Sequence, residues 1–179
     1  NLYIIAEGPK GVYLVDQHAA HERVLYEKVR SELRDSAPQI QGLLEPVVVE
    51  LPVIQEEVLE AHRDEWIRYG FDLEAFGPHS YLLRALPASL KDVDPEHAFL
   101  AVLEDVGQGE ENVLDWEEKM VCSIACHSAV RAGKTLTQEE MVHLLAKLEA
   151  TNHPNTCPHG RPTMVHLSAA HLQREFGRR

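Results

Sequence analysis

Hydrophobic and polar positions along the chain predict short strands at both ends. Residues 2–7 and 12–16 are β-rich runs separated by Gly8-Pro9-Lys10-Gly11, which indicates a hairpin. From Gln17 to about Leu33, apolar residues recur every three to four positions, as in an amphipathic helix. A third strand is expected over residues 43–52, where Pro46 suits an edge or a bulge.

The middle and C-terminal parts alternate helices and strands. We expect an acidic helix over 52–70, strands over 71–76 and 80–86, a helix over about 95–105 and a loop over 107–112. Asp115 with Glu118 and Thr137 with Glu140 each form a capping-box pattern, and Gly133 suits the C-cap of the first helix. A strand over 163–167 and a short helix opened by Ser168 complete the chain. The pattern predicts an α+β fold in which the middle section is an insertion.

Length and composition narrow the class of protein. A chain of 179 residues with 44% hydrophobic content supports one core, or one core with a smaller satellite. It has neither a membrane-length apolar run nor a signal-peptide pattern, which favours the cytoplasm, and the strand-like start at Asn1 favours a domain of a longer protein. The net charge of -12 argues against a surface that binds nucleic acid without help from a partner.

The stretch DQHAAHERVLYE, residues 16–27, concentrates candidate metal ligands. On a helix, His18 and Glu22 lie about 40° apart on the stripe that Leu25 continues, so both should face packed material. A carboxylate there needs a cation or strong donors. Asp16 is either a further ligand or an N-cap, and Glu27 lies nearly opposite His18. The alternative is a solvated helix with an ordinary His–Glu surface pair.

A second group of candidate ligands lies in CPHGRP, residues 157–162. Cys157 and His159 are two positions apart, so in an extended segment both project to one side and form a zinc-type pair. The alternative is an ordinary loop thiol and imidazole. Cys122 and Cys126 share a helix face next to small residues, which is typical of a core, although Cys126 is close enough to the helix end to reach a metal. An odd number of cysteines makes a disulfide framework improbable.

Four motifs in order give the chain a family resemblance. DQHAAHERVLYE fits the pattern D-Q-H-A, two residues, E, four residues, E; ACHSAVRAGK from Ala125 resembles an A-C-R type motif; CPHGRP and the F-x-R of Phe176 to Arg178 also match. Together they resemble the C-terminal dimerisation and endonuclease domain of bacterial MutL mismatch-repair proteins. One departure is His127, which stands where a basic residue is expected.

The resemblance implies a nicking endonuclease that cuts one strand of duplex DNA as a homodimer in the bacterial cytoplasm, associated with the nucleoid. It implies bound Zn2+, with Mn2+ or Mg2+ for nicking. Residues 1–50 and 113–179 would form the dimerisation and metal-site subdomain, and 51–112 an outer regulatory one. The implied metal ligands are Asp16, His18, Glu22, Cys126, Cys157 and His159, and the implied catalytic group is Asp16, His18 and Glu22 with Glu27 in support. Expected DNA contacts are Arg131, Lys134, Arg161 and Arg178.

The remaining implied partners are proteins. QGLLEP, residues 41–46, resembles the Q-x-x-L-x-P peptide by which such domains engage the DNA polymerase sliding clamp, anchored by Gln41, Leu44 and Pro46. The alternative for this stretch is simply the entrance to the third strand. MutS and an N-terminal ATPase region of the same chain complete the implied partners, and no membrane is expected. The alternative function is a non-catalytic dimerisation or interaction domain with a structural zinc.

Overall fold

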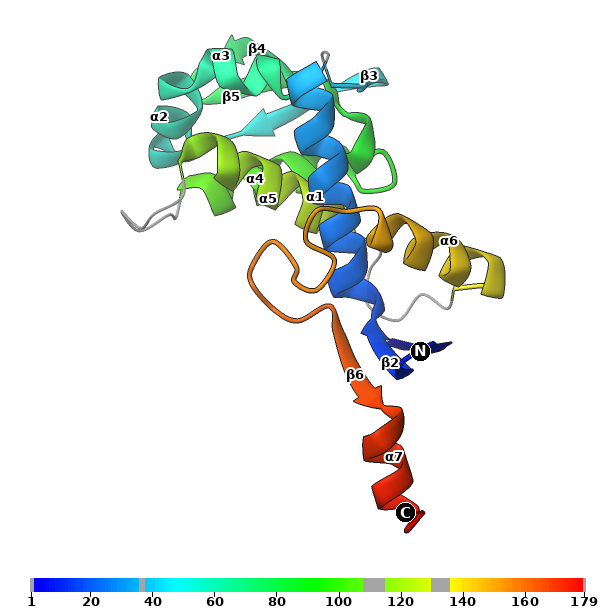
Figure 1. Ribbon diagram of the computed structural model, residues 1–179. Coiled ribbons are helices and arrows are strands. Elements are labelled where there is room, and N and C mark those ends of the chain that lie inside the picture. The colour runs from blue at the N-terminus through cyan, green and yellow to red at the C-terminus, as the bar shows by residue number, and fades with distance from the viewer. Residues whose placement is uncertain (1, 36–37, 108–114, 130–135, 179) are drawn as a thin grey trace. The chain divides into compact units, whose positions relative to one another are not determined.

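The chain divides by its internal contacts into two compact units. The computed structural model describes residues 2–35, 38–107, 115–129 and 136–178 (Figure 1). Unit 1 comprises Asn1–Glu27 and Ala129–Arg179, and unit 2 comprises Lys28–Ser128. Helices and small antiparallel sheets occur in both, which confirms the predicted α+β fold. None of the described helices is both long enough and apolar enough to cross a bilayer.

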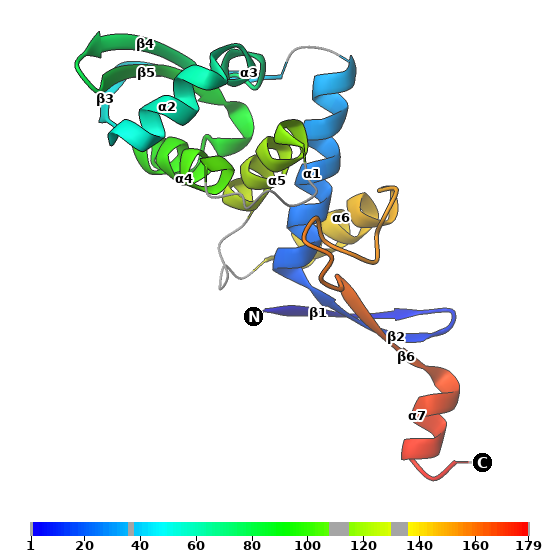
Figure 2. The same cartoon turned by 90° about the vertical axis from the view of Figure 1, so that its left-hand side faces the viewer.

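Unit 1 is built on a three-stranded antiparallel sheet. Its strands are β1 (Tyr3–Gly8), β2 (Gly11–Asp16) and β6 (Met164–Ser168), in the order β1-β2-β6 (Figure 2). The predicted hairpin joins β1 to β2. Gly11 is required in it, because φ is +137° and an added Cβ would lie 2.2 Å from the Leu167 carbonyl oxygen.

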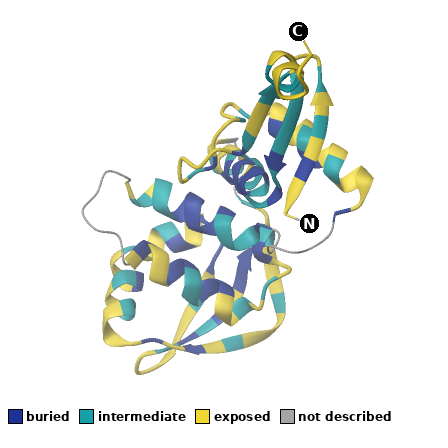
Figure 3. Ribbon diagram, turned by 90° about the horizontal axis from the view of Figure 1, so that it is seen from below, coloured by how far each residue is buried: buried dark blue, intermediate teal, exposed yellow. Residues whose placement is uncertain are grey.

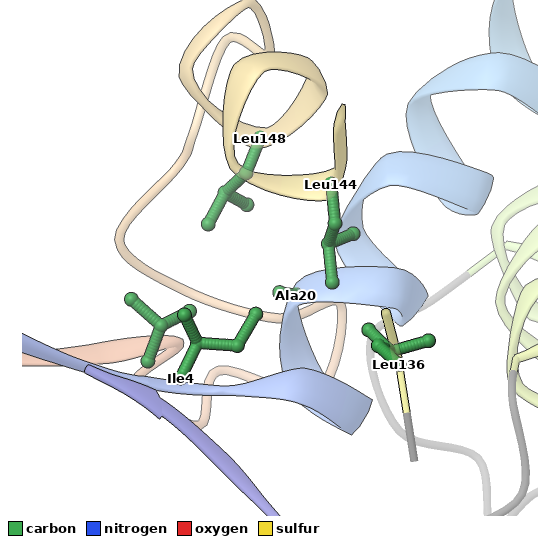
Figure 4. Close-up of a cluster of buried hydrophobic side chains, with 6 residues drawn as sticks. Ile4, Ala20, Leu136, Leu144 and Leu148 are labelled. Atoms are coloured by element: carbon green, nitrogen blue, oxygen red, sulfur yellow. The ribbon is translucent and has the colours of Figure 1, made fainter. Parts of the chain in front are cut away.

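One face of this sheet forms the core of unit 1. Ile4, Val15 and Met164 lie in register across the three strands, and successive residues of a strand point to opposite faces. Helices α1 (Gln17–Asp35) and α6 (Gln138–Glu149) cover this side. The buried cluster consists of Ile4, Val15, Ala20, Leu136, Leu144 and Leu148 (Figure 4).

The opposite face of the sheet is also apolar. Ile5, Leu14 and Val165 form the next row across β1, β2 and β6, and the side chains of Ile5 and Val165 are exposed, Ile5 by 75%. Tyr3 is exposed on the same side of β1. We call Tyr3, Ile5, Leu14 and Val165 the outer sheet face. A continuous apolar patch of this kind marks an interaction surface more often than a bare monomer surface.

The helix signals at the C-terminal end of the chain are confirmed. Thr137 and Glu140 form the capping box of α6 through reciprocal bonds of 3.2 and 2.7 Å. Ser168 caps α7 (Ala169–Glu175) by accepting a bond from the His171 amide. The helix α7 continues from β6 beyond the sheet and has no buried residue (Figures 1 and 3).

Unit 2 packs helices against a second antiparallel sheet. The strands are β3 (Ile40–Glu50), β4 (Asp72–Gly77) and β5 (Ser80–Pro87), in the order β3-β5-β4. The helices are α2 (Val53–Ala61), α3 (Arg63–Arg68), α4 (Pro95–Gly107) and α5 (Trp116–Ser128), with a 3-10 turn at Ala88–Leu90. Trp66, Phe71 and Phe99 form an aromatic centre with ring centroids 5.0 to 5.9 Å apart.

The structure departs from the sequence prediction at one helix. The single helix expected over 52–70 is two helices, because His62 leaves helical geometry with φ -125° and ψ 31°. The strand β3 pairs with β5 and α5 packs against α4, so both belong with the middle section. The division by internal contacts falls at Glu27 and Ala129. The subdomain bounds expected from the sequence, 1–50 with 113–179 and 51–112, stay a prediction. The predicted loop residues 108–112 and the Gly133 cap lie outside the described residues.

The edge strand β3 contains an irregularity. Its pairing with β5 is interrupted between Gly42 and Val47, and Pro46, which cannot donate to a ladder, lies in the interruption. The Leu44 side chain is 105% exposed. Residues 43–46 are therefore an unpaired, largely solvent-facing segment of the edge strand, which agrees with the prediction that Pro46 suits an edge or a bulge.

Candidate metal centre

Helix α1 starts directly after β2, and Asp16 marks the junction. One of its oxygens, Oδ1, accepts bonds from the amides of His18 at 2.9 Å and Ala19 at 3.0 Å. This is the arrangement of an N-cap, which stabilises the first turn of a helix by about 1 kcal/mol. The capping alternative is thus present in the structure, and metal ligation by Asp16 stays a prediction.

The first turns of α1 bring His18 and Glu22 together. His18 Nε2 lies 3.0 Å from Glu22 Oε1, the i, i+4 pairing predicted from helical spacing. Their environments differ sharply: the Glu22 side chain is 7% exposed and that of His18 is 43% exposed. The carboxylate is therefore buried as predicted, whereas the prediction that His18 also faces packed material is wrong, because its imidazole reaches the surface.

The loop that carries Cys157 and His159 is a tight, internally bonded turn. A bridge pairs Thr156 with Pro162, and the Cys157 amide donates to the Arg161 carbonyl at 2.8 Å. Inside this bridge, the Gly160 amide donates to the Cys157 carbonyl at 2.9 Å, with φ at +78°. These bonds fix the spacing of the thiol and the imidazole on one turn.

The turn and the helix meet at Glu22. The second carboxylate oxygen, Oε2, lies 3.8 Å from His159 Nδ1, and the His159 side chain is 47% exposed. The buried Cys157 thiol donates a hydrogen bond to the same carboxylate. Burial raises the pKa of the Cys157 thiol above its ordinary value, and the hydrogen bond and negative charge of Glu22 act in the same direction. Unit 1 thus places a thiol and two imidazoles around the Glu22 carboxylate.

This donor set fits a divalent transition metal. Zinc is bound in proteins by thiolate, imidazole and carboxylate ligands, and Glu22 and His159 offer atoms within 4.8 Å of each other. Both ion partners that the structure gives Glu22 are imidazoles, which carry charge only when protonated. A cation bound at this place would compensate the buried negative charge of Glu22, which neutral imidazoles do not.

Glu27 lies outside this cluster. Its Oε2 accepts a bond of 2.9 Å from Asn152 Nδ2, and its Oε1 lies 3.5 Å from a guanidinium nitrogen of Arg23. The carboxylate is thus occupied with the segment that precedes the CPHGRP turn, in line with its predicted place on the far side of α1. The supporting role in catalysis that the resemblance implies for Glu27 stays a prediction.

The residues on α5 belong to unit 2. Cys122 is buried in the helix packing, as a core cysteine should be, and Cys126 is partly exposed. His127 Nε2 lies 3.0 Å from Asp105 Oδ2, which also accepts a bond of 2.7 Å from the Ser123 hydroxyl. The predicted metal ligation by Cys126 stays a prediction. The Asp105 partnership was missed because sequence spacing gave no signal that α4 and α5 meet there.

The predicted DNA contacts are spread along the chain. Arg161 is exposed on the CPHGRP turn, two positions after His159. Arg178 follows α7, which starts where Ser168 pairs with Gly11, at the end of the sheet away from Asp16. Within unit 1, the F-x-R motif is therefore remote from Glu22. Arg131 and Lys134 lie outside the described residues.

Known proteins with similar sequences belong to the family that the motifs resemble. The sequence pattern of the family described as MutL C terminal dimerisation domain matches residues 1–136. Proteins named DNA mismatch repair protein MutL are similar to the chain over its length: that of Phenylobacterium zucineum is 43% identical over 99% of the chain, and that of Caulobacter vibrioides is 41% identical over 99%.

A third relative of the same name, from Koribacter versatilis, is 36% identical over 98% of the chain. The matched region is 29% of the first of these relatives and 28% of the other two. The chain thus spans less than a third of the length of the curated relatives it matches. Since the family pattern covers most of its residues, the chain belongs to the MutL C-terminal dimerisation domain family of DNA mismatch repair proteins.

Proposed function

We propose that this domain is a divalent-metal-dependent nicking endonuclease that cuts one strand of duplex DNA as a homodimer. The observation that carries the proposal is the cluster at Glu22, where a buried carboxylate meets the buried Cys157 thiol and two imidazoles. The cluster joins two motifs that are separated by about 140 positions in the sequence. Such a convergence in a MutL domain supports a functional site.

The exposure of the cluster favours catalysis over a purely structural metal. A catalytic metal must be reached by substrate and water, whereas a structural zinc site is closed. The carboxylate and thiol are buried, but the imidazoles of His18 and His159 are each nearly half exposed. A substrate phosphate can therefore approach from the imidazole side. This observation ranks the endonuclease above a non-catalytic domain with a structural zinc.

The residues of the chain have distinct roles in this proposal. When bound, Zn2+ with Mn2+ or Mg2+ supplies Lewis-acid chemistry for hydrolysis at phosphorus. Glu22, His18, Cys157 and His159 would hold it, with Asp16 and Cys126 as further candidates. Arg161, exposed on the same turn as His159, would attract the phosphate backbone.

Cutting should depend on tethering. With 29 acidic and 17 basic residues, the domain as a whole repels duplex DNA. A clamp, MutS and an N-terminal ATPase region would replace intrinsic affinity by a high local concentration of DNA. The matched region is 29% of the first MutL relative, so that relative has room for such a region.

The first test is plasmid nicking by the full-length protein with Mn2+ and the clamp. Replacing Glu22 by Ala removes the centre of the cluster and should lower the nicking rate by about 100-fold or more, since loss of even outer-shell partners costs about 10- to 100-fold. Glu32→Ala, on the same helix and paired with Lys28, is the matched control and should nick normally. Normal nicking by a folded Glu22→Ala protein would contradict the proposal.

The clamp assignment is supported by the irregular segment of β3. A buried Leu44 could not contact a clamp, but Leu44 is fully exposed on an unpaired segment. Gln41 and Pro46 are exposed on either side of it. A short peptide that presents its side chains in this way can dock into a partner's groove without unfolding the strand.

Replacing Leu44 by Ala should weaken clamp binding by about 30-fold, the cost of losing an anchor worth about 2 kcal/mol. Clamp-stimulated nicking should fall, while basal Mn2+-dependent nicking stays unchanged. Surface plasmon resonance with immobilised clamp measures the first effect. Ile54→Ala, another exposed aliphatic residue of unit 2, is the control. Equal clamp affinity in the Leu44 and Ile54 variants would rule the segment out.

The outer sheet face is the surface we propose for dimerisation. Tyr3, Ile5, Leu14 and Val165 would pair with the same residues of a second copy about a two-fold axis, which is the usual symmetry of a homodimer. The burial of their apolar area supplies the driving force.

A charge at the centre of the outer sheet face should dissociate the dimer. Ile5→Glu places a carboxylate where two apolar sheets would meet and leaves it without a partner. Multi-angle light scattering should show a folded monomer for Ile5→Glu and a dimer for Ile54→Glu, whose position is equally exposed in unit 2. A dimer of undiminished stability in both variants would place the interface elsewhere.

A further inference from the structure

Arg23, one position after Glu22, is buried although it is charged and cannot bind a metal ion. Its residue is 6% exposed, whereas arginines of a protein are mostly at the surface. An inward guanidinium is costly unless it is fully engaged. The partners that compensate the buried guanidinium therefore indicate the role of Arg23.

Those partners tie the helix to the metal-site loop. Arg23 Nε donates a bond of 2.6 Å to the Thr156 carbonyl, and Thr156 directly precedes Cys157. A second guanidinium nitrogen lies 3.5 Å from Glu27, and the guanidinium carbon lies 5.1 Å from the centre of the Tyr26 ring. All three partners lie in unit 1, so the helix and the loop are joined within one compact body.

Glu27 adds a second point of attachment. It accepts the bond from Asn152 Nδ2, four positions before Thr156. One face of α1 thus holds the loop at 152 and 156, while the neighbouring face presents Glu22 to the thiol and imidazole of the same loop. Because the turn after Thr156 is internally bonded, fixing the Thr156 carbonyl fixes where Cys157 and His159 point.

We infer that Arg23 is a positioning residue, held by Glu27, that sets the CPHGRP turn at the distance from Glu22 at which the ligands can share one ion. The inference rests on the proposed metal function and assigns Glu27 to the loop anchor instead of the reaction. It also explains the choice of arginine: a planar guanidinium binds a carbonyl and a carboxylate in two directions, and a lysine has only one nitrogen.

The test is Co2+ binding by the full-length protein. A Co2+ titration followed by absorption measures the affinity, and the sulfur-to-metal absorption band shows whether a thiolate is bound. Arg23→Lys keeps the charge and Arg23→Gln keeps a hydrogen-bond donor, yet both should weaken Co2+ binding by about 10- to 100-fold, the range for residues that orient ligands. The sulfur band should weaken at equal Co2+. Arg63→Gln, an exposed arginine of unit 2 paired with Glu60, is the control.

A second measurement, made without metal, separates this inference from the proposed function. Hydrogen exchange should become faster at the amides of Cys157 and Gly160 in Arg23→Gln, while the amides of β1 and β2 keep their protection. Unchanged Co2+ affinity and exchange in both Arg23 variants would overturn the inference. Exchange that rises equally throughout unit 1 would also overturn it, because it would show a general role in stability. Normal Co2+ binding by wild-type protein that never nicks DNA would instead count against the proposed function alone.

Discussion

A carboxylate held inside the protein at Glu22 is the constraint around which unit 1 is organised. Burying it without compensation would cost several kcal/mol, so the surrounding elements must deliver partners. The Asp16 cap fixes the start of α1 after β2, which sets the direction of His18 and Glu22. The CPHGRP turn supplies the thiol and the second imidazole. The sheet and α6 then provide the core on which both segments rest.

Much of this arrangement could be predicted from local sequence. The hairpin, the start of α1, the Thr137 capping box and the Ser168 cap each depend on a few neighbouring residues, and each is found where expected. The contact between His18 and Glu22 followed from the helical period, but the expected burial of His18 did not, since its side chain is 43% exposed. The association of this pair with Cys157 and His159 did not, because it depends on contacts about 140 positions apart. There, ordered motifs of a known family supplied what spacing could not.

The features that the sequence did not predict depend on contacts between segments that are distant in the chain. A run of residues such as 40–50 reads as a strand in either unit, and only its pairing with β5 assigns it to unit 2. Likewise, Arg23 looks like a solvated helix residue until its bond to Thr156 is known. The break at His62 is another example, since the acidic pattern continues across it without interruption. Periodicity identifies the type of an element but not the neighbour that it binds.

The central claim is that Cys157, His159, His18 and Glu22 share one ion, and the coordination shell tests it most directly. Zinc K-edge X-ray absorption of the full-length protein should show mixed ligands, with sulfur at about 2.3 Å and lighter atoms at about 2.0 to 2.2 Å. The sulfur contribution should fall in Cys157→Ser. A shell of nitrogen and oxygen alone, or a sulfur contribution that Cys157→Ser leaves unchanged, would contradict the account.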